Sequence, residues 1–224
     1  MESEIHTVKI ISVEPVTHNV KRFRLQKPDG YTFNPGQATE ASINTPELKE
    51  EKRPFTFTCL PEDDHLEFTI KIYSDHNGVT NALGHVKAGE ELIIRDVWGA
   101  IEYKGPGTFI AGGAGVTPFI AIFRWLDKNG KVDTNQLIFS NRTSKDIILK
   151  DEFEKMLGSN FINILSEESG GGFEHGRIDE AYLEKNITNF KQKFYICGPD
   201  PFIKDISEAL TRLGAQTESV VFEK

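Results

Sequence analysis

Cysteine is scarce in this sequence, and long apolar runs are missing. Cys59 and Cys197 are the only cysteines among 224 residues, and they lack the close spacing of metal ligands. This argues against a disulfide framework and an iron–sulfur cluster, and we expect no bound metal. No apolar stretch is long enough to span a bilayer. Residues 1–4 are polar and acidic, unlike a secretion signal, so we expect a cytoplasmic protein.

Positive charge is also in deficit. The chain has 26 lysines and arginines against 34 aspartates and glutamates, which gives a formal net charge of −8. A net negative charge argues against a nucleic-acid-binding surface as the main function, with a local basic patch as the alternative, so we expect no nucleic-acid partner. Hydrophobic residues make up 38% of the chain and include 16 phenylalanines, enough for a substantial core. The length suits one large domain or two small ones.

The first half of the chain has the period of β structure. Short runs with strand character are separated by turns such as Lys27-Pro28-Asp29-Gly30. The expected strands are residues 7–13, 20–25, 38–43, 55–60, 66–73 and 92–96. Many short strands joined by turns predict a small, six-stranded antiparallel barrel.

The second half changes period at residue 109. The expected strands are residues 109–111, 136–140, 161–165 and 194–197, and they alternate with helical patterns near 118–128, 148–157, 179–186 and 200–213. Alternation of this kind predicts a parallel sheet covered by helices on both faces, a Rossmann-like domain. We place the boundary at residues 103–107, which gives domains of residues 1–103 and 104–224. Residues 167–176 are predicted to form a mobile loop.

A glycine-rich stretch lies between the first strand and first helix of the second half. Its sequence is Gly112-Gly113-Ala114-Gly115-Val116-Thr117-Pro118. A strand, a glycine loop and a helix form the layout in which backbone N–H groups and a helix N-terminus meet a pyrophosphate. Pro118 suits the first turn of a helix because its missing N–H costs little there. A glycine-rich turn without a ligand remains the alternative, since Pro118 replaces the third glycine of the usual fingerprint.

Two groups of residues in the first half also suit a phosphorylated ligand. Arg53-Pro54-Phe55-Thr56 combines a guanidinium fork with an aromatic side chain on the same side of a strand. After Lys71-Ile72-Tyr73, the stretch Gly78-Val79-Thr80 predicts a helix start with Thr80 as a candidate cap. Each group taken alone has an ordinary explanation as an ion pair, a core position or a turn.

Together these motifs resemble the ferredoxin–NADP reductase superfamily of flavin-dependent reductases. Arg53-Pro54-Phe55-Thr56 looks like its Arg-x-Tyr-Ser/Thr flavin motif, and residues 112–118 look like its Gly-Gly-x-Gly-x-Thr-Pro nucleotide loop. Cys197-Gly198-Pro199-Asp200-Pro201-Phe202 looks like its nicotinamide-site motif. The motifs occur in the family's order over nearly the whole chain. The resemblance implies an FAD-binding barrel, an NAD(P)-binding α/β domain, and electron transfer to a small carrier protein such as ferredoxin or flavodoxin.

The resemblance also implies roles for residues of the barrel. Arg53 would bind the FAD pyrophosphate, Phe55 would stack on the isoalloxazine ring, and Thr56 would hydrogen-bond near flavin N5. Phenylalanine in place of the family's commoner tyrosine keeps the stacking but loses a hydroxyl contact. The other implied FAD contacts are Pro54, Lys71, Ile72, Tyr73, Gly78, Val79 and Thr80.

In the second domain the resemblance implies a nicotinamide site. Gly113 and Gly115 would let the nucleotide pyrophosphate approach, and Thr117 would lie near the nicotinamide. Cys197 would face the position of hydride transfer. Together with Thr56, near flavin N5, it is an implied catalytic residue. The alternative for Cys197 is a small buried residue that only fills space in the core. The remaining implied contacts are Pro118, Asn141, Arg142, Gly198, Pro199, Asp200 and Glu223.

The nucleotide and the acceptor stay open at this stage. Arg142, after the second strand of the α/β half, favours the 2′-phosphate of NADPH, and no acid follows that strand to bind the ribose diol of NADH. The same stretch, Asn141-Arg142-Thr143, also resembles NADH-using relatives of the nitrate and cytochrome b5 reductase type, and Arg142 as a solvated residue is a third possibility. The functional alternatives are a non-catalytic flavin-binding sensor and an NADH-dependent reductase component for an oxygenase or cytochrome. We expect a monomer.

Overall fold

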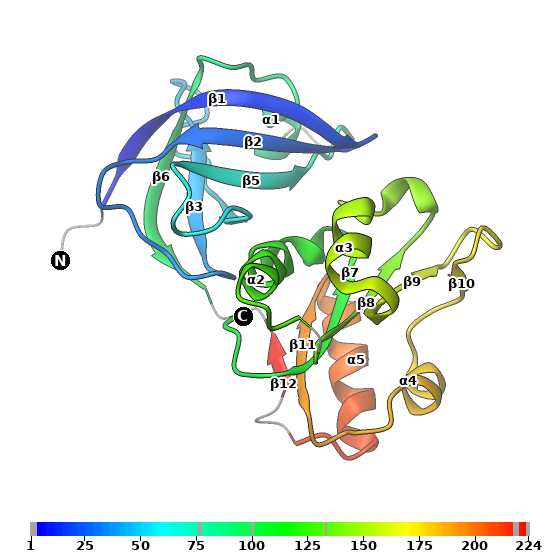
Figure 1. The fold of residues 1–224 in the computed structure, drawn as a ribbon. Helices are drawn as coiled ribbons and strands as arrows, with labels where there is room; N and C mark the ends of the chain where they lie inside the picture. The colour runs from blue at the N-terminus through cyan, green and yellow to red at the C-terminus, as the bar shows by residue number, and fades with distance from the viewer. Residues whose placement is uncertain (1–3, 76–77, 100, 133, 217–219, 223–224) are drawn as a thin grey trace.

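The computed structural model describes residues 4–75, 78–99, 101–132, 134–216 and 220–222. A β domain comes first in the chain, and an α/β domain follows beside it (Figure 1). Within the described residues, no helix is both long and apolar enough to cross a membrane. The two halves therefore differ in architecture as the change of sequence period predicts.

The β domain is a six-stranded antiparallel sheet that closes on itself. Its strand order is β4-β3-β6-β1-β2-β5. The strands are β1 (His6–Thr17), β2 (Val20–Gln26), β3 (Ala38–Ile43), β4 (Arg53–Thr56), β5 (His65–Lys71) and β6 (Glu91–Trp98). Beyond the end of β4, Phe57 bridges to Phe68 on β5, and Thr58 N donates to Glu67 O at 2.8 Å. This contact joins the two edge strands and confirms the predicted barrel.

Strand β5 is buried on both of its faces. Leu66, Phe68 and Ile70 point into the barrel core, as expected for side chains that alternate along a strand. Glu67 and Thr69 point the other way but are only 3% and 5% exposed. The outward face of this strand is therefore covered, in part by Arg124 of the second domain, which contacts Glu67.

The α/β domain is built on a six-stranded, all-parallel sheet with the order β10-β9-β8-β7-β11-β12. Its strands are β7 (Gly107–Gly112), β8 (Gln136–Asn141), β9 (Phe161–Leu165), β10 (Glu174–His175), β11 (Lys193–Cys197) and β12 (Val220–Phe222). Its helices are α2 (Thr117–Lys128), α3 (Lys150–Leu157), α4 (Glu180–Asn186) and α5 (Asp200–Arg212), with short 3₁₀ turns η1 (Gly113–Val116), η2 (Ser144–Asp146) and η3 (Gly158–Asn160).

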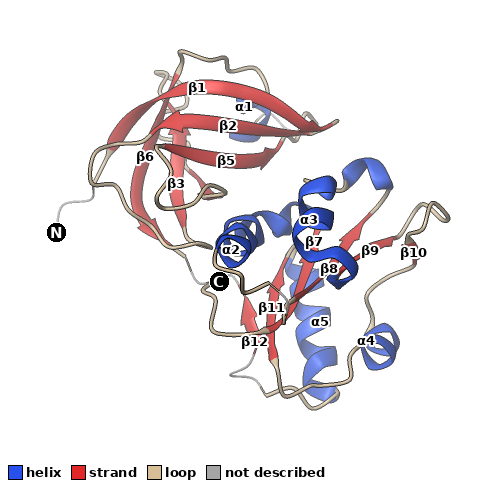
Figure 2. Cartoon of the chain, in the orientation of Figure 1, coloured by secondary structure: helices blue, strands red, loops and turns tan. Residues whose placement is uncertain are grey.

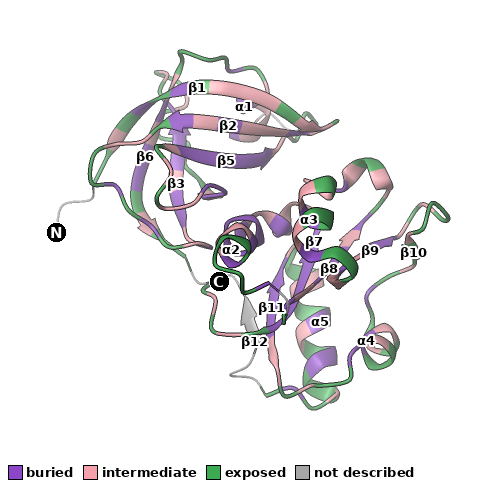
Figure 3. Cartoon of the chain, viewed as in Figure 1, coloured by how far each residue is buried: buried purple, intermediate pink, exposed green. Residues whose placement is uncertain are grey.

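Alternation along the parallel strands distributes the helices over both faces of this sheet (Figure 2). Phe109 and Ala111 of β7 pack in one cluster with residues of α2 and α3. Ile110, between them, packs in another cluster with residues of α4 and α5. Strands β7, β8, β9 and β11 are accordingly buried along most of their length (Figure 3).

Several local expectations are corrected by the structure. Strand β4 begins at Arg53 and ends at Thr56, rather than spanning residues 55–60, because Pro54 is tolerated at the edge of a sheet. The first helix of the chain, α1 (Val79–Leu83), has Gly78 as its N-cap, so Thr80 lies in the first turn and is not the cap. The predicted loop at residues 167–176 is a loop as far as residue 173, turning through glycines with positive φ, but its last part contains the short strand β10; its mobility stays a prediction.

The domains meet along helix α2. Gly36 of the barrel lies so close to Ile101 and Ile122 that a Cβ there would come within 2.2 Å of the Ile101 carbonyl oxygen. In the connecting segment, the Tyr103 ring stacks on Phe109 at 6.4 Å between centroids. The boundary after residue 103 stays a prediction.

Candidate active site between the two domains

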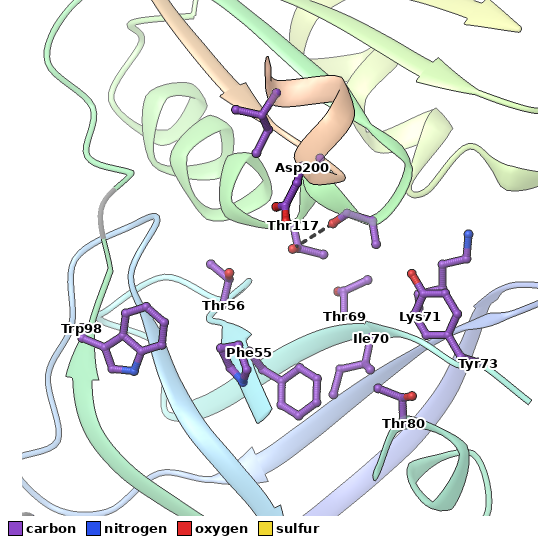
Figure 4. A pocket seen from close by; sticks show the side chains of 14 residues that line it. Phe55, Thr56, Thr69, Ile70, Lys71, Tyr73, Thr80, Trp98, Thr117 and Asp200 are labelled. Atoms are coloured by element: carbon purple, nitrogen blue, oxygen red, sulfur yellow. Dashed lines mark hydrogen bonds between the residues drawn. The ribbon is translucent and has the colours of Figure 1, made fainter. Parts of the chain in front are cut away.

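A cavity of about 390 Å³ lies where the two domains meet. Figure 4 shows Thr117 and Asp200 on one side of it and barrel residues, among them Phe55 and Thr80, on the other. The lining residues are Pro54, Phe55, Thr56, Thr69, Ile70, Lys71, Tyr73, Thr80, Trp98, Ala114, Thr117, Gly198, Asp200 and Ile203. One cavity thus brings together three motifs that are far apart in the sequence.

The barrel wall combines aromatic rings with polar groups. Phe55 is half-buried, with its ring centroid 5.9 Å from that of Phe68 in the core. Thr56 follows it, 9% exposed. Lys71 Nζ lies 5.6 Å from the ring centroid of Tyr73, whose side chain is 44% exposed. Flat rings beside hydroxyl groups and a cation suit a ligand that has both an aromatic ring and phosphates.

Arg53 does not line the cavity in this structure. Its side chain is about half exposed, with Nη1 donating to Lys52 O at 2.6 Å and Nη2 lying 3.8 Å from Glu51 Oε2. Exposed ion pairs of this kind contribute about 0–1 kcal/mol. A phosphate could therefore displace Glu51 at little cost, and the pyrophosphate role of Arg53 stays a prediction.

The nucleotide-side wall is formed by the glycine loop and the start of helix α2. Gly113 has φ +54°, and a Cβ there would meet no atom within 4 Å, so the backbone is open to a ligand. Gly115 has a different reason to be glycine, since a Cβ there would lie 2.4 Å from the carbonyl oxygen of Cys197. Thr117 Oγ1 donates to Ala114 O at 3.0 Å and holds the loop closed. Pro118 lies in the first helical turn, as predicted.

Cys197 ends strand β11 and is only 4% exposed. Gly198 and Asp200, just after it, line the cavity, whereas Cys197 is not among the lining residues. Asp200 lies in the first turn of α5, where a carboxylate is favoured by the helix dipole. The catalytic role implied for Cys197 therefore stays a prediction.

Asn141 is an unusual buried residue at the carboxyl end of β8. It is 6% exposed, and both polar atoms of its side-chain amide are buried with no hydrogen-bond partner in the described structure. Buried amide groups are nearly always hydrogen-bonded, so an unpartnered one at the ligand-binding edge of a parallel sheet fits a polar ligand. Arg142 follows, its side chain 78% exposed and its Nε 3.7 Å from Glu167 Oε1.

The structure divides the expected site residues into two groups. Pro54, Phe55, Thr56, Lys71, Tyr73, Thr80, Thr117, Gly198 and Asp200 line the cavity. Arg53, Ile72, Gly78, Val79, Gly113, Gly115, Pro118, Asn141, Arg142, Cys197 and Pro199 are not among its lining residues, and Glu223 lies outside the described residues. The side chain of Val79 is buried in the barrel core, so only its backbone could contact a ligand.

Sequence reasoning missed several residues of the site. Thr69 and Trp98 line the cavity, and Glu167 lies beside Arg142. Trp98 pairs with Ala38, which pairs in turn with Thr56, so the three residues form one row across neighbouring strands. Glu167 follows β9, and because β8 and β9 are parallel neighbours their ends meet at one edge. The sequence signal is that Arg142 and Glu167 each follow an expected strand, but it identifies a pair only once β9 is known to lie beside β8.

Comparison with known proteins agrees with this geometry. Residues 7–103 match the model of the oxidoreductase FAD-binding domain, and residues 109–208 match that of the oxidoreductase NAD-binding domain. The chain is 31% identical to NADH-cytochrome b5 reductase 1 of Ajellomyces capsulatus, over 92% of this chain and 73% of that one. It is 29% identical to the reductase component of propane 2-monooxygenase of Mycolicibacterium goodii, over 87% of this chain. The chain spans only 60% of that relative's length.

Solved structures share the fold over nearly the whole chain. A ferredoxin NADP⁺ reductase from Neisseria gonorrhoeae, with bound FAD and NADP, has a TM-score of 0.85 at 18% identity, covering 97% of each chain. The FAD/NAD-binding domain of nitric oxide dioxygenase from Vibrio cholerae O1 biovar El Tor has a TM-score of 0.85 at 20% identity, covering 96% of each chain.

The residues present fit both groups that the family models name. Aromatic rings, threonine hydroxyls and Lys71 surround the barrel side of the cavity, and the buried amide of Asn141 lacks a partner at the nucleotide edge. Motifs, fold, domain models and the 31% identical relative agree over both halves. The chain belongs to the ferredoxin–NADP reductase-like superfamily of FAD- and NAD(P)-binding oxidoreductases.

Proposed function

We propose that this chain passes electrons from NAD(P)H through FAD to a separate electron-carrier protein. One observation carries the proposal. The cavity has Phe55 and Thr56 of the barrel on one wall and Thr117 and Gly198 of the α/β domain on the other. Two rings held between such walls can react directly, because positioning accounts for much of the rate of a transfer between bound reactants.

The barrel residues would hold FAD. Phe55 would supply the ring contact, Thr56 a hydroxyl at its edge, and Lys71, Thr80 and Arg53 would bind the phosphates. FAD, when bound, can accept a hydride from a nicotinamide and release the electrons singly or in pairs. The protein itself would bind and orient FAD and the nucleotide and exclude water from between them. No side chain is required to act as a general base.

The α/β domain would hold the nucleotide. Gly113 leaves backbone open to the pyrophosphate, the amide of Asn141 would gain the partner it lacks, and Thr117 with Gly198 would border the nicotinamide. We further propose that the pair Arg142–Glu167 sets the preference between nucleotides. The guanidinium would attract the 2′-phosphate of NADPH, and the carboxylate would oppose it.

The names of the relatives favour one class of acceptor. They include reductase components of propane 2-monooxygenase, a naphthalene 1,2-dioxygenase system and a glycine betaine monooxygenase. A second candidate function is therefore the reductase component of an oxygenase system, which would feed a ferredoxin-like carrier or the oxygenase itself. We also propose that the protein works as a monomer in the cytoplasm and that its domains divide after residue 103.

The experiment uses the purified protein. We expect it to be yellow, to release FAD on acid treatment, and to bleach anaerobically when NADPH or NADH is added. Release of FMN alone would contradict the assignment of the phosphate-binding residues, because FMN has no pyrophosphate. Bound FAD that neither nucleotide bleaches would instead support the non-catalytic flavin module. Bleaching rates with the two nucleotides side by side would give the preference.

A further inference from the structure

A buried chain of polar groups runs from the contact between the domains to the wall of the cavity. It begins at Arg124 on helix α2. One side of the guanidinium faces the barrel, where Nη1 donates to Glu67 Oε1 at 2.6 Å and to Thr58 O at 2.7 Å. The other side faces helix α3, where Nε and Nη2 donate to the two carboxylate oxygens of Glu152 at 2.5 and 3.0 Å.

Glu67 is the central group of this chain. It lies on the outward face of β5 and is 3% exposed. Burial alone would raise its pKa, but the Arg124 charge, hydrogen bonds from Arg124 and Thr58, and the Arg22 charge outweigh burial and lower the pKa from 4.5. Arg22 Nε and Arg24 Nε lie 3.9 and 3.6 Å from its second oxygen. Glu67 is therefore a carboxylate that can only accept hydrogen bonds.

The ionised state of Glu67 sets the direction of the next hydrogen bonds. Thr58 Oγ1 lies 2.9 Å from Glu67 Oε1 and 3.2 Å from Thr69 Oγ1. The Thr58 hydroxyl has a single proton, and it goes to the carboxylate, which is charged and, at 2.9 Å, nearer than the Glu67 backbone carbonyl oxygen at 3.3 Å or Thr69 Oγ1. Thr69 must then donate its own proton to Thr58. Because Thr69 lines the cavity, its hydroxyl has only lone pairs left to offer there.

We propose that Arg124 and Glu67 are positioning residues of the flavin site, which act through Thr58 to fix the Thr69 hydroxyl as a hydrogen-bond acceptor for an O–H or N–H group of bound FAD. This inference rests on the proposed function, because FAD is the ligand it requires. It gives the contact between the domains a direct effect on the flavin wall, beyond holding the two halves together.

The role of Arg124 in the chain follows from the charge of Glu67. Without the guanidinium, the buried carboxyl would take up a proton more readily, because burial disfavours its charged form. A protonated Glu67 could donate to Thr58, and Thr58 could then donate to Thr69. The hydroxyl of Thr69 would be released to point its proton into the cavity, where it would oppose a donor on the ligand.

The test measures the affinity of FAD for the apoprotein by titration, with the absorption spectrum of bound FAD as a second readout. Thr58→Val removes the linking hydroxyl, and Thr58→Ser keeps it. Arg124→Met removes the charge but keeps an unbranched apolar chain. Lys128→Met is the matched control, since Lys128 lies on the same helix and pairs with Glu62 of the barrel at 2.6 Å, but at the surface.

We expect Thr58→Val and Arg124→Met each to weaken FAD binding by roughly two- to tenfold, the range for loss of one hydrogen bond, and to shift the flavin spectrum alike. Thr58→Ser and Lys128→Met should bind as the wild type does. The double variant Arg124→Met/Thr58→Val should bind FAD as tightly as whichever single variant binds it less tightly. Both changes interrupt the same series of hydrogen bonds, so their effects should not add.

Wild-type affinity in Thr58→Val would overturn the inference while leaving the proposed function intact. The inference would also be overturned if the losses of FAD affinity in the two single variants multiplied in the double variant, or if Lys128→Met lost as much affinity as Arg124→Met. Arg124 would then act only as a contact between the domains. Should Arg124→Met fail to fold, the comparison of Thr58→Val with Thr58→Ser decides alone. Failure of the wild-type apoprotein to bind FAD would instead refute the proposed function, and this inference with it.

Discussion

Replacing Arg124 by alanine should destabilise the protein far more than replacing any surface cation. The substitution leaves the Glu67 carboxylate, which is 3% exposed, without its main partner. Breaking a buried ion pair by removing one member typically costs about 3–5 kcal/mol. The Thr58 carbonyl also loses a donor, which costs about 1–3 kcal/mol for a buried acceptor and is part of that total. Glu152, which is 33% exposed, adds little.

The assay is denaturant unfolding at pH 7, followed by tryptophan fluorescence and circular dichroism. We expect Arg124→Ala to lower the free energy of unfolding by about 3–5 kcal/mol. Lys128→Ala serves as the control, because its pair with Glu62 is exposed and should contribute about 0–1 kcal/mol. A loss below about 1 kcal/mol for Arg124→Ala would refute the reasoning, since the carboxylate could not then depend on this guanidinium.

The same pair predicts how stability responds to acid. The pKa of Glu67 is lowered in the folded protein, with burial opposing the shift and Arg124, Thr58 and Arg22 producing it. A lowered pKa stabilises the fold above the unfolded value of 4.5, and this stabilisation is lost as the pH falls through the folded value. In Arg124→Ala the largest of the contributions that oppose burial is gone, so we expect the pKa of Glu67 in the folded protein to rise above its unfolded value. The difference between the two proteins should therefore shrink as the pH falls, beginning above pH 4.5 in the variant and continuing below it as the wild type loses its stabilisation, and a constant difference would contradict this account.

Three further predictions concern ligands. Arg53→Ala should weaken FAD retention more than it slows reduction of molecules that keep FAD, as FAD content and stopped-flow bleaching would measure; equal losses in both would contradict a phosphate role. Arg142→Ala should lower kcat/KM for NADPH roughly ten- to more than hundredfold, because a charge-assisted bond is worth about 1.5–3 kcal/mol, and should leave kcat/KM for NADH nearly unchanged. Glu167→Gln should raise kcat/KM for NADPH. Steady-state kinetics with both nucleotides test this, and parallel effects on both would contradict the role of the pair. Cys197→Ala should keep FAD and slow anaerobic flavin reduction by up to roughly a hundredfold, because a displacement of about 1 Å can cost that much; reduction at the wild-type rate would leave Cys197 a packing residue.

The local pattern of the chain determined both halves of the fold. Short runs of strand character such as residues 66–73 predicted a barrel, and the alternation of strands with helices after residue 109 predicted a parallel sheet. The structure confirms both architectures, and the family models confirm the binding domains. These features are local, since side-chain alternation and backbone freedom at glycine act within a few residues.

Tertiary packing decided what covers each face and which ends meet. Alternation showed that Glu67 and Thr69 leave the barrel core, but nothing near them in sequence could show that Arg124, 57 residues away from Glu67, closes over that face. Likewise, Glu167 reaches Arg142 only because β8 and β9 lie side by side. An ion pair forms between groups that folding brings within a few ångströms, so its partners are set by the packing of whole elements rather than by the pattern within any one of them.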